Sequence, residues 1–168
     1  MPSPQPASTL LRKARAFARM PLFEQGYFLP TWLLLGLSRG AVLLLPFRRL
    51  AAFLGDAHGP QGRVPPASAS QAQRARRIAR VIRVAARYTP WDSNCFAQAL
   101  TARLLLGLYR IPCAVFFGLM HDHDAARALR AHAWVRSGDV AVSGGANVDR
   151  FTVVQCFSWP RTAPGGTP

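Results

Sequence analysis

The sequence predicts an α+β fold in which a helix that begins with a cysteine packs on a small antiparallel sheet. Residues 95–106 are apolar on nearly all sides of a helix, which is typical of a central helix that a sheet covers. Residues 113–119 form a continuous apolar run of strand length, which indicates a central strand. Residues 130–136 and 140–143 flank a Ser-Gly-Asp turn, which predicts a hairpin, and residues 151–157 predict a last strand.

The rest of the chain divides into segments of different composition. A Pro/Ser-rich start is expected to be disordered, apolar helices follow, and a Pro- and Gly-rich stretch is typical of a linker. The expected boundaries are a disordered N-terminus at 1–9, an N-terminal helical segment at 10–55, a linker at 56–70, the core at 71–158 and a loose tail at 159–168.

The N-terminal helical segment contains a strongly apolar stretch at 28–45, which follows a short basic helix at 10–19 and a break or turn at 21–27. A membrane-spanning helix needs about 20 apolar residues, so a span is one interpretation. Arg39 near the middle and the prolines at both ends argue against it. We expect a helix that is buried or covered by a partner, and membrane contact is not favoured. A further short helix is expected at 46–55.

Two other features have a functional and a structural interpretation. Residues 71–87 predict an amphipathic helix whose arginine face could bind phosphates, although a solvated face is preferred. A loop at 120–129 contains His121-Asp122-His123-Asp124, which could bind a metal together with His132 because His and Asp are ordinary ligands. No paired ligand motif occurs elsewhere, so we expect a solvated loop at the mouth of a site, with no metal and no cofactor.

Cys95 and His132 are the candidate catalytic pair. Asp92, Ser93 and Asn94 are all good N-cap residues, so Cys95 should lie in the first turn of its helix whichever of them caps. The free N–H groups and positive dipole end there stabilise a thiolate, the nucleophilic form of cysteine. The same N–H groups could hold the oxyanion of a tetrahedral intermediate.

The strand around His132 supplies the partner. Its alternation directs His132 and Trp134 to one face and Ala133 and Val135 to the other. A cysteine at a helix start and a histidine on a strand form the pair that thiol acyl chemistry requires. Gln98, one turn after Cys95, either lines the site or makes a polar core contact.

Composition limits the partners and the compartment. The formal charge of +14, from 21 Lys and Arg against 7 Asp and Glu, would suit nucleic acid or an acidic membrane surface. The arginines are spread along the chain without interleaved aromatics, so we interpret them as solvated helix faces and expect no nucleic-acid partner. An acidic peptide would suit the charge equally well. Three cysteines without a disulfide framework, and no secretory signal, indicate a reducing cytoplasm.

Three motifs carry a resemblance to a known family: Pro-Trp-Asp-Ser-Asn-Cys-Phe-Ala-Gln-Ala-Leu at 90–100, Ala-His-Ala-Trp-Val at 131–135 and Val-Ser-Gly-Gly at 142–145. Over roughly residues 10 to 157 the chain resembles the lasso-peptide biosynthesis B proteins. These are transglutaminase-like leader peptidases related to the microcin-processing protein, and the closest form is the stand-alone protease. The resemblance implies a papain/transglutaminase-like core at 71–158 in which an antiparallel sheet supplies the histidine and an acid.

The resemblance also implies a function. Cys95 would form an acyl-enzyme and His132 would act as general base and acid, and together they would remove the leader from a ribosomally synthesised precursor peptide. The implied partners are a separate precursor-recognition protein and an ATP-using lasso cyclase. Transfer of the acyl group to an amine would make the protein a transamidase. The alternative from another class is a basic, non-catalytic binding module for nucleic acid or anionic membrane.

The third catalytic residue departs from the family pattern, because Gly144 occupies the position on the next strand where an Asp is usual. Asp139 lies at the hairpin turn, roughly 20 Å from His132 at about 3.3 Å per residue, and is rejected. Asp149 in the following loop is our choice to orient the imidazole. The alternatives are Asn147, Ser143 or a backbone carbonyl.

Overall fold

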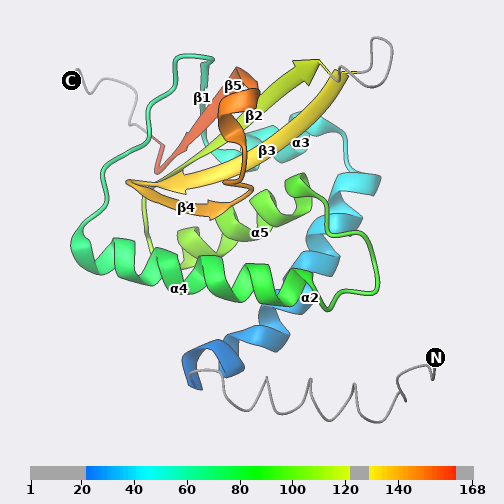
Figure 1. Cartoon of the computed structure of the whole chain (residues 1–168), viewed down its shortest axis with the longest axis vertical. Helices are drawn as coiled ribbons and strands as arrows, with labels where there is room; N and C mark the ends of the chain where they lie inside the picture. Colours follow the sequence, from blue (N-terminus) through cyan, green and yellow to red (C-terminus); the bar gives the residue numbers. More distant parts are fainter. Residues whose placement is uncertain (1–21, 122–128, 162–168) are drawn as a thin grey trace, which may run out of the picture.

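The computed structural model describes residues 22–121 and 129–161, which fold into helices packed on one face of an antiparallel sheet (Figure 1). The helices of this part are α2 (Leu22–Leu44), α3 (Phe47–Leu54), α4 (Ala69–Ala86), α5 (Cys95–Leu108) and the short 3-10 helix η1 (Val148–Arg150). The strands are β1 (Asp56–Gly59), β2 (Cys113–His121), β3 (Leu129–Ser137), β4 (Val140–Ser143) and β5 (Thr152–Trp159). The predicted α+β class is confirmed.

The five strands lie in the order β1-β5-β2-β3-β4, and every neighbouring pair is antiparallel. The central position of β2 and the β3–β4 hairpin are therefore as predicted. β4 is short and pairs with β3 only from Val135 onward, where Val135 lies opposite Ser143. Within 22–121 and 129–161, the edge of β3 from Leu129 to Trp134 consequently has no strand beside it on the β4 side.

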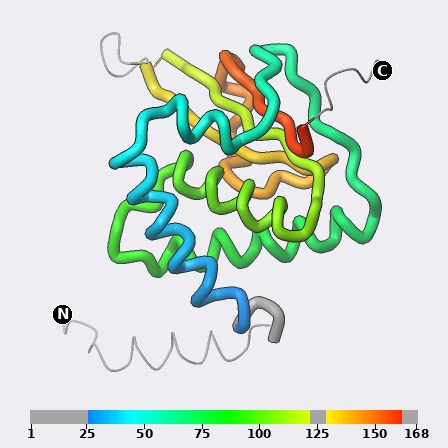
Figure 2. Tube along the Cα trace, turned by 180° about the vertical axis from the view of Figure 1, so that it is seen from behind, coloured from blue at the N-terminus to red at the C-terminus, as the bar shows by residue number. Residues whose placement is uncertain are grey.

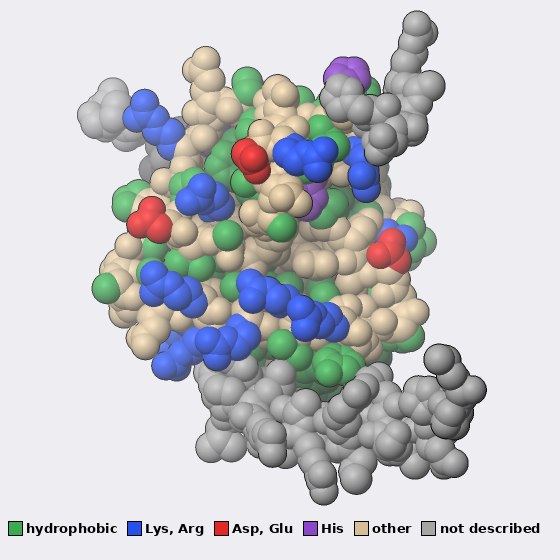
Figure 3. All heavy atoms as spheres, viewed as in Figure 1, with side chains coloured by type: hydrophobic (Ala, Val, Ile, Leu, Met, Phe, Trp, Pro, Cys, Tyr) green, Lys and Arg blue, Asp and Glu red, His purple; other side chains and the backbone are tan. Residues whose placement is uncertain are grey.

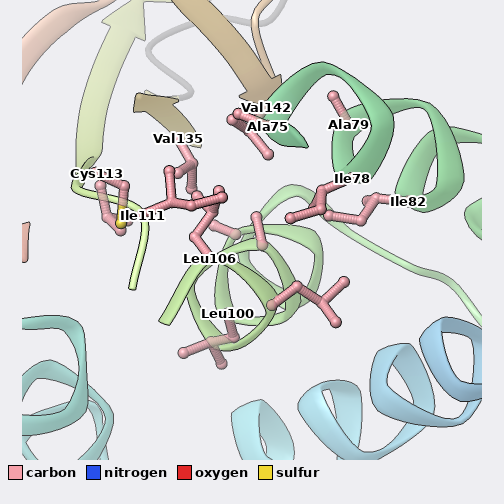
Figure 4. Packing of buried hydrophobic residues seen from close by; sticks show 14 of the residues in the cluster. Ala75, Ile78, Ala79, Ile82, Leu100, Leu106, Ile111, Cys113, Val135 and Val142 are labelled. Carbon is pink, nitrogen blue, oxygen red and sulfur yellow. The ribbon is translucent and has the colours of Figure 1, made fainter. Parts of the chain in front are cut away.

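α5 is the central helix of the molecule, as its apolar sequence predicts. It contacts β3 on one side, α4 on another and α2 on a third. Figure 2 shows α2 crossing α5 on the side away from the sheet. The main core lies between these elements, where Leu106 of α5, Ile78 and Ile82 of α4, Val135 of β3 and Val142 of β4 are all buried (Figure 4).

A smaller apolar cluster occupies the other face of the sheet. It contains Phe116 of β2, Trp134 of β3 and Cys156 of β5, with Phe151 packed against them. Gly118 of β2 makes this possible, since a Cβ at that position would lie 2.9 Å from both the Trp134 ring and the Phe151 Cβ. The alternation of β3 thus assigns Trp134 to this face and Ala133 and Val135 to the main core, as predicted.

α2 differs from the prediction at its start and presents an apolar surface along its length. The helix begins at Leu22, so the break or turn predicted for 21–27 is wrong from that residue onward. The stretch 26–44 is long and apolar enough to cross a membrane by length and composition, and 17 % of it is buried. The side chains exposed on this helix include Leu29, Leu33, Leu37 and Leu44.

The predicted linker at 56–70 contains an element of the sheet. β1 pairs with β5, and the His58 imidazole Nε2 hydrogen-bonds the Ser158 hydroxyl at 2.5 Å. The linker interpretation was therefore wrong at its start, because a distant strand imposes extended structure on a sequence that has no strand pattern of its own. Arg103 of α5 contacts two segments that adjoin β1. Its Nε donates to the Leu54 carbonyl at the end of α3 at 3.0 Å, and its guanidinium lies 4.4 Å from the ring centre of Trp159 at the end of β5.

The remaining predicted helices agree with the structure. α3 ends at Leu54, next to Gly55. α4 begins with a capping box in which the Ser68 hydroxyl accepts from the Gln71 N–H and the Gln71 side chain accepts from the Ser68 N–H. The predicted basic helix at 10–19, the disordered start at 1–9, the end of the tail and most of the His-Asp loop lie outside the described residues.

Candidate active site

Cys95 is the first residue of α5, as the cap residues predict. The cap is Asn94, whose backbone is extended (φ −62°, ψ 169°) and whose side-chain oxygen accepts from the Ala97 N–H at 2.9 Å. The first N–H groups of a helix have no acceptor within the helix, and they carry its partial positive charge. The Cys95 thiol therefore lies at a position where negative charge on sulfur is stabilised.

A hydrogen-bonded loop fixes the approach to Cys95. The Thr89 hydroxyl bonds the carbonyl oxygens of Ala86 and Trp91, both at 3.0 Å, and the Ser93 hydroxyl at 2.9 Å. The Trp91 ring packs on Trp32 of α2 with ring centres 4.6 Å apart. This support was not predicted from the sequence, although Thr89 and Ser93 near Pro90 are the residue types that form side-chain-to-backbone turns.

Gln98 makes a polar contact at the start of α5. Its Nε2 donates to the Ser93 carbonyl at 2.7 Å, which ties the first turn of α5 to the preceding loop. The same residue lines a cavity of about 410 Å³ between α4, α5 and the end of β4. Gln98 is thus a structural contact and a lining residue of this cavity, and whether it lines the catalytic site stays a prediction.

Cys95 is the partly exposed member of three free cysteines. Burial raises the pKa of the Cys113 thiol to about 12, an effect that the nearby Arg103 charge reduces. Burial also raises the pKa of Cys156 to about 11. Both buried thiols stay protonated near neutral pH, so neither can serve as a nucleophile there.

His132 lies on β3 and is half-buried. Its Nε2 is 2.7 Å from the Gly144 carbonyl oxygen, which can only accept. Nε2 therefore carries a proton, and in the neutral ring the lone pair is on Nδ1. The ring lies 5.0 Å from the Phe151 ring and stacks at 5.8 Å on Trp134, centre to centre. These contacts fix the plane of the imidazole.

The backbone of Gly144 holds His132 in place of an acid. Asp149, our choice from the sequence, lies exposed in η1 and makes no hydrogen bond to the imidazole. Asn147 is also exposed. The partner is instead the backbone carbonyl, one of the alternatives, which Gly144 presents because its positive φ of 62° turns the chain back toward β3.

The Cys95 thiol and the His132 imidazole form no hydrogen bond with each other in the described part of the chain. Cys95 packs at the margin of the main core below the sheet, whereas His132 shares the other face with Trp134 at the unpaired edge of β3. Gln98, one turn after Cys95, and Gly144, whose carbonyl accepts from His132, both line this cavity, whereas Cys95 and His132 do not.

The described residues offer no metal site. Across 22–121 and 129–161, no three His, Cys, Asp or Glu side chains are grouped closely enough to hold an ion. Of the His-Asp loop, only His121 falls in that part of the chain. The described candidate residues offer the Cys95 thiol, the His132 imidazole and the backbone N–H groups at the start of α5.

The comparisons with known proteins agree with the fold. The model of the transglutaminase-like superfamily matches residues 41–156, which include α5, β2, β3 and β4. No curated protein matches the chain, and no solved structure does. The match covers more than half of the chain and contains both Cys95 and His132. By this match, and by a fold in which a cysteine-headed helix packs on an antiparallel sheet, the chain belongs to the transglutaminase-like superfamily.

Proposed function

We propose that the protein is a cysteine peptidase that removes the leader from a ribosomally synthesised lasso-peptide precursor. The observation that carries the peptidase chemistry is the position of Cys95, the partly exposed thiol, at the start of a capped helix. The leader-peptidase assignment is supported by the motifs at 90–100 and 131–135, which resemble those of the lasso-peptide B proteins.

The reaction begins with proton transfer from the Cys95 thiol to Nδ1 of His132. The thiolate attacks the scissile carbonyl carbon, and the N–H groups at the start of α5 stabilise the resulting oxyanion. Collapse of the tetrahedral intermediate breaks the C–N bond, and Nδ1–H protonates the departing amine. His132 then takes a proton from water, whose oxygen attacks the thioester, and Cys95 recovers its proton as the acid product leaves.

The Gly144 carbonyl orients the base throughout these steps. Its bond to Nε2–H selects the tautomer whose Nδ1 can accept a proton, and it stabilises the imidazolium that forms after the transfer. A carbonyl oxygen carries less negative charge than a carboxylate. The imidazolium is accordingly less stabilised than in a triad with Asp.

The test uses iodoacetamide and mass spectrometry of the intact full chain, followed by cleavage of the precursor. Cys95 should be alkylated first, and His132→Ala should slow that alkylation. Cys95→Ala and His132→Ala should each abolish cleavage while their thermal unfolding remains cooperative. Cys113→Ala is the matched control and should still cleave. Cleavage that persists in Cys95→Ala would refute the proposal.

The acceptor of the acyl group distinguishes the related function. A peptidase product carries a free carboxylate at the cleaved bond, and a transamidase product carries a new amide, which has a different mass. The basic binding module, the alternative from another class, depends on the net charge of +14 and predicts binding that is indifferent to Cys95→Ala.

Partners and compartment belong to the same proposal. A stand-alone leader peptidase would act with a separate precursor-recognition protein and with an ATP-using cyclase. A reducing cytoplasm is supported by three cysteines that are all free. Co-purification of the three proteins with a tagged precursor peptide tests the set of partners.

A further inference from the structure

A cavity lies beside the first turn of α5, one turn from Cys95. It has a volume of about 410 Å³ and lies between α4, the first turn of α5 and the end of β4. Much of its lining is small, including Ala79, Ala141 and Gly145. Gly144, whose carbonyl accepts from the His132 Nε2, also lines it.

Two hydrogen-bond donors at this cavity have no acceptor in the described part of the chain. Ser143 is 7 % exposed, and its hydroxyl is buried with no partner. A buried hydroxyl without a partner is costly, which makes it a candidate for bonding to a ligand. Arg83 of α4 lies on the same cavity, is exposed, and forms no ion pair or hydrogen bond with the described residues.

A second cavity extends the same seam between α4 and the β3–β4 hairpin. It has a volume of about 450 Å³ and is lined by Arg76 of α4 and by Arg136 of β3, whose buried Nε also has no partner. Arg76 and Arg83 are seven residues apart on one helix, about 10 Å at 1.5 Å per residue. About three residues of extended peptide span that distance.

We propose that this seam is a recognition groove for an acidic stretch of the peptide substrate, with one carboxylate side chain held by Arg83 and Ser143. The proposal rests on the peptidase function and names the substrate class that the site selects. The Ser143 hydroxyl and the Arg136 Nε have no acceptor in the described part of the chain, and the chain carries a net charge of +14. Figure 3 shows basic side chains gathered in a band over α4, whose sequence contains arginines and no lysine. Arginine is the residue that binds carboxylates most specifically.

A peptide fits the groove better than a nucleic acid does. The cavity at Arg83 has a lining rich in alanine and glycine, and the sequence of α4 contains no aromatic residue on which a base could stack. Gln98, which lines this cavity, lies one turn after Cys95 on α5. Nucleic acid is therefore the competing outcome of the test.

The test measures binding of fluorescein-labelled octaglutamate to the full chain carrying Cys95→Ala, by fluorescence anisotropy. Octaglutamate should bind, and octaglutamine should not. Arg83→Gln should weaken binding about tenfold, as expected when a charge-assisted hydrogen bond is lost. Arg87→Gln is the matched control, because it makes the same charge change at the end of the same helix but outside both cavities, and it should weaken binding less than about twofold.

Ser143→Ala separates ligand binding from folding. The substitution removes a buried hydroxyl that has no partner, so the variant should melt no lower than the unchanged protein and yet bind octaglutamate more weakly. Equal losses in Arg83→Gln and Arg87→Gln would show attraction by bulk charge and overturn the groove. Tighter, Arg83-dependent binding of labelled oligothymidylate would overturn the peptide class. Because binding needs no turnover, these failures leave the Cys95 cleavage test unaffected.

Discussion

Replacing Gly144 by alanine should destabilise the protein and release His132. The residue has a φ of 62°, and a left-handed conformation costs an L-residue about 1–2 kcal/mol. A Cβ there would lie 2.5 Å from the Ala133 carbonyl oxygen, so backbone must move, at a further cost of about 1–3 kcal/mol. We expect Gly144→Ala to lower the free energy of unfolding by about 2–5 kcal/mol.

Gly138→Ala is the matched control. Gly138 also has a left-handed φ, of 51°, but its added Cβ would lie 3.4 Å from Ala67, an ordinary contact. Both substitutions restrict the unfolded chain equally. The difference between their losses in free energy of unfolding therefore measures the cost of the close approach at Gly144. Urea denaturation gives the two free energies, and nitrogen NMR of the His132 ring reports whether Nε2 keeps its proton. Equal destabilisation, with an unchanged His132 spectrum in Gly144→Ala, would refute this reasoning.

The remaining predictions concern buried polar groups. Because burial raises the pKa of Cys113 to about 12 and of Cys156 to about 11, the unfolded chain loses thiol protons above its ordinary pKa of 9.0 while the folded chain keeps them. The free energy of unfolding should be unaffected by these thiols below pH 9.0 and should fall above it by about 1.4 kcal/mol per pH unit for Cys113. Urea titrations across that range should show a shallower fall in Cys113→Ala, and an identical slope would contradict the assignment. Arg103→Lys keeps the charge but leaves the Leu54 carbonyl without its Nε donor. The free energy of unfolding should therefore fall by about 1–3 kcal/mol in the same assay. An unchanged free energy of unfolding would show that this hydrogen bond contributes nothing.

Local sequence patterns predicted the elements whose stabilising contacts are local. Asn94 caps α5 within three residues of the N–H that it bonds, and the turn at Gly138 fixes the β3–β4 hairpin from inside its own sequence. The apolar run that became β2 needs burial on both faces, and its central place in the sheet supplies that burial. These features could be read from a window of a few residues.

The features that the sequence could not predict depend on distant partners or on backbone. β1 has no strand pattern and forms because β5, about a hundred residues later, pairs with it. The orienting group of His132 is a carbonyl of Gly144, which every residue type possesses, so no side chain marks it. A prediction restricted to side chains therefore pointed to Asp149 in the loop after β4. In the structure Asp149 is exposed and does not orient His132.

The place of β5 in the sheet has a consequence for biosynthesis. This strand follows all the others in the chain, yet it is inserted between β1 and β2. While residues 152–159 remain inside the ribosome, β1 has no neighbour and one side of β2 is bare. The sheet can therefore close only after translation has passed Trp159, and until then the nascent chain exposes unpaired strand edges of the kind that chaperones recognise.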